Sequence, residues 1–176
     1  SINDVDEEVL ERAKNDPIFF AALMEKLFGA ADTFNTPTVD LLLAGNEDRL
    51  VEYKSTVRWN MREERRDRTM EHVIAKTVAG FLNGGGGTLL IGVDDDGHPL
   101  GLDADYKLVR PTNSDGLINF LDTMLENTLG HSGSHRVQIR FDIVNEKEVC
   151  RLDIPASSKP IWLTKDGEQV LHQRRN

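Results

Sequence analysis

The segment from Met70 to Gly97 constrains the fold of this chain more than any other. Apolar and small residues recur there at intervals of three and four, which predicts an amphipathic helix over 69–82 with a face made of Met70, Val73, Ile74, Thr77, Val78, Phe81 and Leu82. Asn83 and four glycines end this helix, and TLLIGV over 88–93 predicts a buried strand. The DDDG turn over 94–97 predicts a hairpin whose second arm is 98–102.

The rest of the chain supplies further strands and helices around this unit. The patterns predict a strand over 50–57, a charged loop or frayed helix start over 58–68, a loop over 103–113 and a helix over 114–130. Strands are predicted over 135–144 and 148–156, followed by a strand pair around IWLT and QVLHQ that turns at Asp166–Gly167.

The sequence of residues 5–45 predicts helices, two of which begin at Asp16–Pro17 and at Thr36–Pro37. The element order therefore predicts an α+β fold, in which a mixed β-sheet carries helices on one face and strand 50–57 lies beside strand 88–93. We divide the chain into an N-terminal helical extension, 1–45, and a domain, 46–176.

Composition restricts the class of protein. The chain has 176 residues, 39% hydrophobic and 29% charged, which is ordinary for a globular protein. Its single cysteine, Cys150, excludes an internal disulfide and a cysteine-based zinc site. The start is acidic and helical rather than a signal peptide, and no apolar run reaches the ~18 residues of a membrane span. We therefore expect a cytoplasmic protein with no zinc and no membrane partner.

The net charge of −9 argues against a protein that binds nucleic acid over its whole surface. A nucleic-acid site would have to be a local basic patch. The run Arg58, Trp59, Arg62, Arg65, Arg66 and Arg68 is such a patch, because arginines interleaved with a tryptophan can hold phosphates and stack a base. Glu63, Glu64 and Asp67 dilute it, and a solvated charged loop is the alternative.

Carboxylates near the first strand are candidates for phosphate chemistry. Glu52 and Lys54 point to one face of strand 50–57, because strand side chains alternate. A carboxylate can hold a hard cation while a lysine meets a phosphate oxygen. Glu47 can join Glu52 only if the chain bends near residues 46–48. The alternative is a surface Glu–Lys pair on an edge strand, which is common and weakly stabilising.

Three adjacent carboxylates, Asp94, Asp95 and Asp96, follow strand 88–93. They repel one another unless a cation or water screens them. The alternative is a solvated hairpin turn, since Asp-Gly turns are very common.

The glycine run 84–87 exceeds what a helix cap requires. A bare backbone lets a phosphodiester or another backbone approach closely, so Gly85 and Gly86 are candidate nucleic-acid contacts. No Gly-Lys-Ser/Thr follows the run, and it lies between a helix and a strand rather than between a strand and a helix. We therefore expect no ATP site.

Together these segments resemble the Schlafen-type AlbA-like domain. That family has a glutamate five residues before a V/L-E-F/Y-K strand, an A-F-x-N-x-x-GG helix end and a strand ending in I-G-V-D-D. GNEDRLVEYKST and AGFLNGGGGTLLIGVDDDGHPLGL fill these places, with Phe81 shifted by one position. VLHQRRN at the end of the chain resembles the start of the family's last motif, with Leu171 and His172 in place of aromatics. The resemblance covers roughly 46–176 and is specific over 46–102.

The resemblance implies nucleic-acid binding and, in some members, metal-dependent RNA cleavage by three carboxylates. These would fall on Glu47, Glu52 and Asp95, with Mg²⁺ or Mn²⁺ as the cation. Lys54 would offset charge on the phosphorus. The nuclease-active animal relatives carry a cysteine-rich zinc site, whose cysteines this chain lacks. These relatives also form their groove from two related lobes, whereas this chain has one lobe. Because a twofold contact would supply the second lobe, we expect a homodimer.

Three hypotheses remain open at this point. The domain is a nucleic-acid-binding nuclease, a catalytically silent DNA- or RNA-binding module, or a protein-interaction domain of a larger regulatory protein, with further domains of its own chain among its partners. The sequence does not distinguish RNA from DNA.

Overall fold

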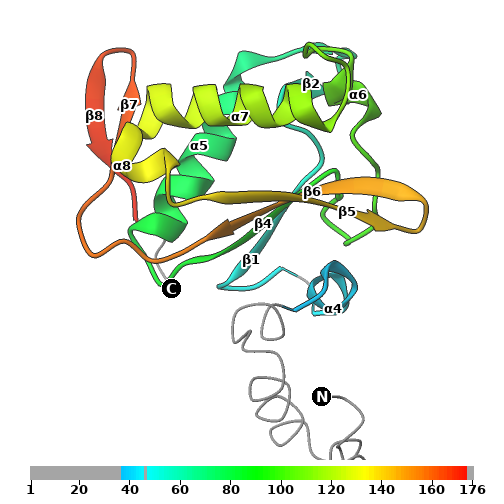
Figure 1. Ribbon diagram of the computed structural model, residues 1–176, viewed down its shortest axis with the longest axis horizontal. Helices are drawn as coiled ribbons and strands as arrows, with labels where there is room; N and C mark the ends of the chain where they lie inside the picture. Colours follow the sequence, from blue (N-terminus) through cyan, green and yellow to red (C-terminus); the bar gives the residue numbers. More distant parts are fainter. Residues whose placement is uncertain (1–36, 46, 174–176) are drawn as a thin grey trace, which may run out of the picture. The chain divides into compact units, whose positions relative to one another are not determined.

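A four-stranded mixed sheet is the centre of the computed structural model, which describes residues 37–45 and 47–173 (Figure 1). The strand order is β1 (Val51–Lys54), β4 (Gly87–Ile91), β6 (Lys147–Ile154) and β5 (Gln138–Val144). β1 pairs with β4 in parallel, and the other two pairings are antiparallel. The predicted α+β class and the pairing of the first strand with the glycine-flanked strand are confirmed.

Two long helices cover one face of the sheet. α5 (Arg68–Leu82) connects β1 to β4 and begins at Asp67, whose side chain accepts a hydrogen bond from the Thr69 N–H, 2.9 Å. α7 (Ser114–Leu129) is capped in the same way by Asn113. Both predicted helices are confirmed, and Figure 1 shows them above the sheet.

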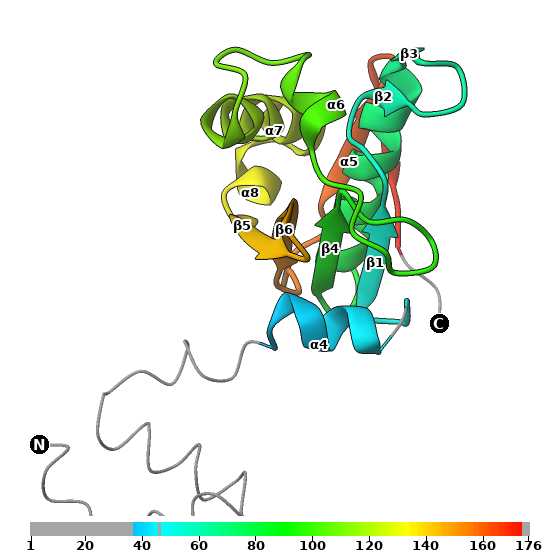
Figure 2. The same cartoon turned by 90° about the vertical axis from the view of Figure 1, so that its right-hand side faces the viewer.

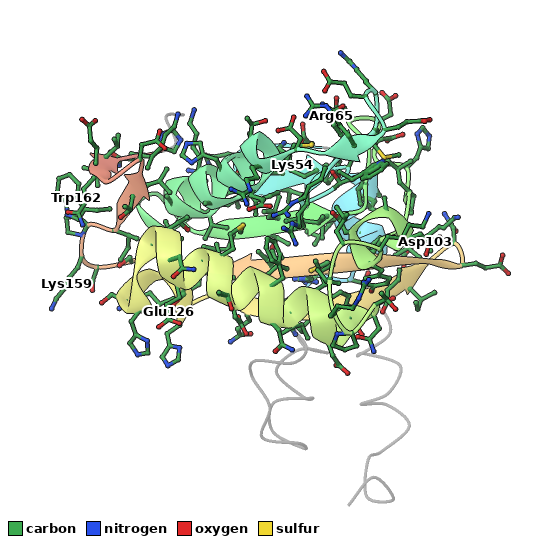
Figure 3. All side chains as sticks on the ribbon, turned by 90° about the horizontal axis from the view of Figure 1, so that it is seen from above. Lys54, Arg65, Asp103, Glu126, Lys159 and Trp162 are labelled. Atoms are coloured by element: carbon green, nitrogen blue, oxygen red, sulfur yellow. The ribbon has the colours of Figure 1, made fainter. Side chains whose placement is uncertain are left out.

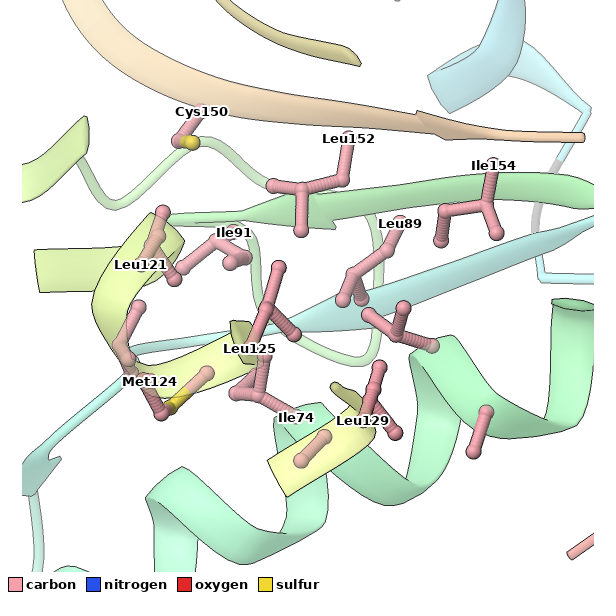
Figure 4. Packing of buried hydrophobic residues seen from close by; sticks show 14 of the residues in the cluster. Ile74, Leu89, Ile91, Leu121, Met124, Leu125, Leu129, Cys150, Leu152 and Ile154 are labelled. Atoms are coloured by element: carbon pink, nitrogen blue, oxygen red, sulfur yellow. The ribbon is translucent and has the colours of Figure 1, made fainter. Parts of the chain in front are cut away.

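Between these helices and the sheet lies the main core (Figure 4). Ile74 of α5 and Leu121 and Leu125 of α7 are almost fully buried there, with Leu89 and Leu152 of the sheet. Each such side chain contributes roughly 1.5–3 kcal/mol through burial, so this core fixes α5 and α7 on the sheet.

The opposite face of the sheet is not bare. α4 (Val39–Ala44) packs there, placing Val39 and Leu42 against Val51 and Tyr53 of β1. The Tyr53 hydroxyl donates to the Leu42 carbonyl at 2.8 Å. Our expectation that helices cover one face only was therefore incomplete, because the buried residues of β1 need a partner on the second face (Figures 1 and 2). The helices predicted over 5–36 lie outside the described residues.

Three short segments differ from the prediction. The charged run forms a two-stranded hairpin, β2 (Trp59–Asn60) with β3 (Arg65–Arg66), in which Asn60 Oδ1 accepts from the N–H groups of the next turn. α6 (Asp103–Tyr106) lies within the expected loop. Residues 98–102 make only one bridge, Val93 with Pro99, because Gly92 and Gly101 take positive φ angles and turn the chain out of the sheet.

The last strand pair, β7 (Trp162–Lys165) with β8 (Glu168–Leu171), is confirmed, as is the β5–β6 pair. A short helix, α8 (His131–Ser134), follows α7. Asn83 at the end of α5 holds the β7–β8 region: its Nδ2 donates to the carbonyls of Ile161 and His172, both at 2.8 Å, and its Oδ1 accepts from the Ile161 N–H. Of the helices that the structure describes, none combines the length and apolar character of a membrane span.

Asp105 of α6 fixes the chain between β1 and β2 from inside the protein. Its two carboxylate oxygens accept hydrogen bonds from the N–H groups of Val57 and Arg58, both at 3.0 Å. Its side chain is fully buried. That burial raises the pKa of the Asp105 carboxyl to about 6, although the two amides and the charge of Arg58 act in the opposite direction.

This raised pKa makes the stability of the domain depend on pH. The unfolded carboxyl titrates near about pH 4, so the folded state binds more protons between about pH 4 and pH 6. The contribution of Asp105 to the free energy of unfolding is fully present below that pH window and is lost as pH rises through the folded-state pKa. Relative to Asp105→Asn, we expect the free energy of unfolding of the wild type to fall by about 1 kcal/mol between about pH 5 and pH 7.

Urea denaturation of both proteins at the two pH values measures this difference. The exposed Asp122→Asn on α7 is the matched control and should differ equally from the wild type at both pH values. If the difference in unfolding free energy between the wild type and Asp105→Asn is the same at both pH values, the raised pKa of Asp105 is contradicted.

Candidate nucleic-acid interface and carboxylate site

The chain bends sharply just before β1, and this bend positions Glu47. Asp48 Oδ1 accepts hydrogen bonds from the N–H groups of Leu50 and Val51 at 2.6 and 2.9 Å. The bend turns Glu47 back, so that its Oε1 accepts from the Tyr53 N–H at 2.6 Å. That amide belongs to the Glu52–Tyr53 peptide, so the Glu47 carboxylate lies against the backbone of β1 at the outer edge of the sheet.

Glu52 and Lys54 lie on the α5 side of β1, because Val51 and Tyr53 are buried on the α4 side. Lys54 Nζ is 2.6 Å from Glu52 Oε1 and donates to the Tyr53 carbonyl at 2.7 Å. Both side chains are about one-fifth exposed. They line an open cavity of about 390 Å³ with residues of α5 and with His172.

Asp95 lies in the turn that follows β4. Its neighbour Asp94 organises this turn, because Asp94 Oδ1 accepts from the N–H groups of Asp96 and His98. Hydrogen bonds from His98 are the main cause of the lowered Asp94 pKa. Asp95 itself is exposed, so of the three aspartates the first is structural.

The structure does not gather the three predicted carboxylates at one point. Among the described residues, the group of acidic and histidine side chains with ligand atoms within 4.8 Å of one another is Asp94, Asp96 and His98. The bend at Asp48 places the Glu47 carboxylate on the Tyr53 N–H, while Glu52 pairs with Lys54.

The β2–β3 hairpin presents the basic side chains of the charged run. Arg62, Arg65 and Arg66 are exposed on it, and Trp59 is half-buried opposite Arg66 in the strand register. Arg65 is paired with Glu63 at 2.5 Å and Arg66 with Glu71 at 3.3 Å. Figure 3 shows Arg65 projecting from one end of the domain, with Lys54 beside α5 between Arg65 and Trp162.

Arg58, which we expected in the same patch, belongs to the fold. Arg58 is buried, with 7% of its surface exposed. Its Nε lies 2.9 Å from Glu71 Oε1, it donates to the Leu108 carbonyl, and its guanidinium stacks 4.0 Å from the centre of the Phe120 ring. With its donors directed inward, Arg58 is not available to a nucleic acid in this conformation.

The glycine run is explained mainly by close backbone packing. Gly86 is buried with φ +78°, and a Cβ there would lie 2.8 Å from the Ile154 carbonyl oxygen. A Cβ on Gly87 would lie 2.6 Å from the Leu50 carbonyl oxygen. Only Gly85 of the two predicted contacts is exposed, with nothing within 4 Å of its Cβ position. The approaching backbone at Gly86 is thus the protein's own.

The cavity beside Glu52 also contains residues that sequence reasoning missed. Lys76 and Thr77 of α5 and His172 after β8 contribute to its lining. Lys76 is indistinguishable in sequence from any solvated lysine of an amphipathic helix. His172 reaches the cavity only because Asn83 binds its carbonyl from 89 residues away in sequence. Burial lowers the pKa of the His172 imidazole, and the charge of Lys76 lowers it further.

Solved structures resemble this fold at low sequence identity. The N-terminal domain of a RecG-related protein from Nitrosomonas europaea matches with a TM-score of 0.55 and 23% identity, over 80% of this chain and 90% of that one. The DIP2311 protein from Corynebacterium diphtheriae matches with a TM-score of 0.52 and 19% identity, over 78% of this chain. This chain spans 27% of DIP2311.

None of the curated proteins matches the chain. The family model described as "Schlafen, AlbA_2" matches residues 47–176, which include the bend at Asp48, β1, the glycine run and the turn after β4. The chain therefore belongs to the Schlafen AlbA_2 family.

Proposed function

We propose that this domain binds a nucleic-acid strand at the β2–β3 hairpin. The observation that carries the proposal is the projection of Arg62, Arg65 and Arg66 from a two-stranded hairpin on an otherwise acidic chain. Guanidinium groups bind phosphate oxygens with two parallel hydrogen bonds, and Trp59 offers a ring beside them. Membership of the Schlafen AlbA_2 family and a fold shared with a RecG-related protein support nucleic acid as the ligand.

Replacing Arg62, Arg65 and Arg66 together by alanine tests this interface. We expect weaker binding of single-stranded RNA or DNA and a smaller salt dependence, because each lost phosphate contact removes about 0.7–0.9 from the slope of log K against log salt. Fluorescence anisotropy over a salt series measures both quantities for each ligand.

The matched control replaces Arg136, Lys147 and Lys159, which are exposed elsewhere, and changes the net charge equally. Equal losses in the two triple variants would mean that only the total charge matters. An unchanged affinity in the hairpin variant would place the nucleic acid elsewhere or exclude it as a ligand.

We further propose that Glu47, Glu52 and Asp95 act with Mg²⁺ or Mn²⁺ in cleavage of the bound strand. Carboxylate oxygens are the ligands these cations prefer, and Glu47 is hydrogen-bonded to the backbone of β1, the strand that carries Glu52. A bound cation would supply an activated water and neutralise developing charge. Lys54, now held by Glu52 at 2.6 Å, would turn to the phosphate once Glu52 is engaged.

The amide variants Glu52→Gln and Asp95→Asn test this chemistry. We expect each to abolish metal-dependent cleavage of RNA while leaving nucleic-acid affinity unchanged or improved, since a negative charge near phosphate is removed. Gel assays of cleavage and anisotropy of the same samples separate the two effects. Mg²⁺ should also raise the melting temperature of the wild type, because it binds the native state.

Glu126→Gln on the exposed face of α7 is the control and should cleave as the wild type does. If the wild type shows neither cleavage nor a thermal shift with metal, the domain is the catalytically silent binding module, and the carboxylates are structural. If the wild type also binds no nucleic acid, both nucleic-acid hypotheses are wrong and the protein-interaction hypothesis remains.

We also propose that two copies of the chain form a homodimer. In the described part of the chain, β1 and β5 are the outer strands of the four-stranded sheet, and one lobe presents one β2–β3 hairpin. A twofold contact would bring two hairpins to one groove. Light scattering at micromolar concentration should give about twice the monomer mass of 19.8 kDa. A single species at the monomer mass contradicts the dimer.

A further inference from the structure

We propose that the cavity between β1, α5 and His172 binds one phosphate of the nucleic-acid strand, with Lys54, Lys76 and His172 as its contacts. The inference rests on the proposed nucleic-acid function and adds a second contact region to the arginine hairpin. A strand bound at both regions would run along the length of α5.

The lining of the cavity suits a phosphate ester. Lys54 enters from β1, Lys76 and Thr77 from α5, and His172 from the segment after β8. Val73 adds an apolar wall, and Gly80 has no side chain to fill the space. The volume of about 390 Å³ is open to solvent and large enough for a phosphate with part of its sugar. Glu52 is the acidic member of the lining, and it is paired with Lys54 at 2.6 Å.

Two histidines and a second lysine lie near Lys76 of this cavity. His72, one turn before Lys76 on α5, lies close enough to Lys76 and Lys165 for their charges to lower its pKa, after the larger effect of burial, while Asp166 acts in the opposite direction. His172 lies within the influence of both Lys76 and His72. The lowered pKa values leave both imidazoles mainly uncharged at neutral pH, so they would act as hydrogen-bond donors to a phosphate, while Lys76 and Lys165 supply the positive charge.

The cavity and the hairpin lie along one helix. α5 begins at Arg68, two residues after β3, and its residues His72, Lys76 and Gly80 follow at intervals of four. At 1.5 Å per residue the distance along the axis from Arg68 to Gly80 is about 18 Å. Figure 2 shows the β2–β3 hairpin at one end of α5, with β1 and the β7–β8 hairpin alongside the helix. A backbone that crosses Arg65 and Arg66 therefore reaches the cavity by following α5.

His172 is fixed in this place by the protein itself. Asn83 donates to its carbonyl at 2.8 Å and binds Ile161 twice. Lys54 is likewise held by the Tyr53 carbonyl at 2.7 Å. The backbone of His172 is thus placed at the cavity before any ligand arrives, which reduces the entropy lost on binding, while Lys54 has to turn from Glu52 to a bound phosphate.

Lys76→Gln and His172→Gln test the proposal, with Lys159→Gln as the matched control. Lys159 is an exposed lysine on the loop before β7, away from Lys54 in Figure 3. The probe is a fluorescent single-stranded oligonucleotide, measured by anisotropy over a salt series. We expect Lys76→Gln to weaken binding on the order of fivefold for any sequence and to reduce the salt slope by about one contact. His172→Gln should weaken binding less, and Lys159→Gln should change neither quantity.

The outcomes separate this inference from the function on which it rests. If the hairpin triple variant loses affinity while Lys76→Gln and His172→Gln bind as the wild type does, the strand does not enter the cavity and the inference is wrong, although the proposed function stands. If the wild type binds no oligonucleotide, both fail. If it then still binds inorganic pyrophosphate, with a loss in Lys76→Gln, the cavity is a site for small phosphates and the proposed strand path is overturned.

Discussion

The parallel pairing of β1 with β4 is the constraint on which the rest of the structure depends. Two parallel neighbours require a crossover between them, and α5 is that crossover. The crossover buries its apolar stripe in the core, and the neighbouring side of the helix, with Val73, Lys76 and Thr77, lines the cavity with Glu52 and Lys54. The β2–β3 hairpin lies at the start of α5, the cavity lies at its side, and Glu52 lies in β1, the strand that precedes it.

Elements with a strong hydrophobic period could be predicted from the sequence. The stripe from Ile74 to Leu82 and the apolar run Leu89–Ile91 predicted α5 and β4, and both form as expected. The chain also bends at Asp48, which the sequence set as the condition for Glu47 to approach Glu52. In these cases local pattern and tertiary packing favour the same structure.

Features that depend on a distant partner could not be predicted in this way. In the sequence, Arg58 is indistinguishable from the other arginines of the basic run. In the structure it is buried, because its guanidinium contacts Glu71, Leu108 and Phe120. The burial of Gly86 depends on the Ile154 carbonyl, 68 residues away in sequence. His172 lines the cavity because Asn83 donates a hydrogen bond to its backbone carbonyl. Each of these is a contact between elements whose relative placement only the folded sheet determines.

The three hydrogen bonds of Asn83 have a consequence for the extent of the domain. They join the C-terminal end of α5, where the glycine run begins, to Ile161 and His172 on either side of the β7–β8 hairpin. That hairpin is not part of the four-stranded sheet, and a boundary chosen by sheet membership would end the domain at Ile154. Such a fragment would lose Ile161 and Leu163 from the core and leave the side-chain amide of Asn83 without these partners. The contacts that hold the core therefore run on to residue 172, beyond the last strand of the central sheet.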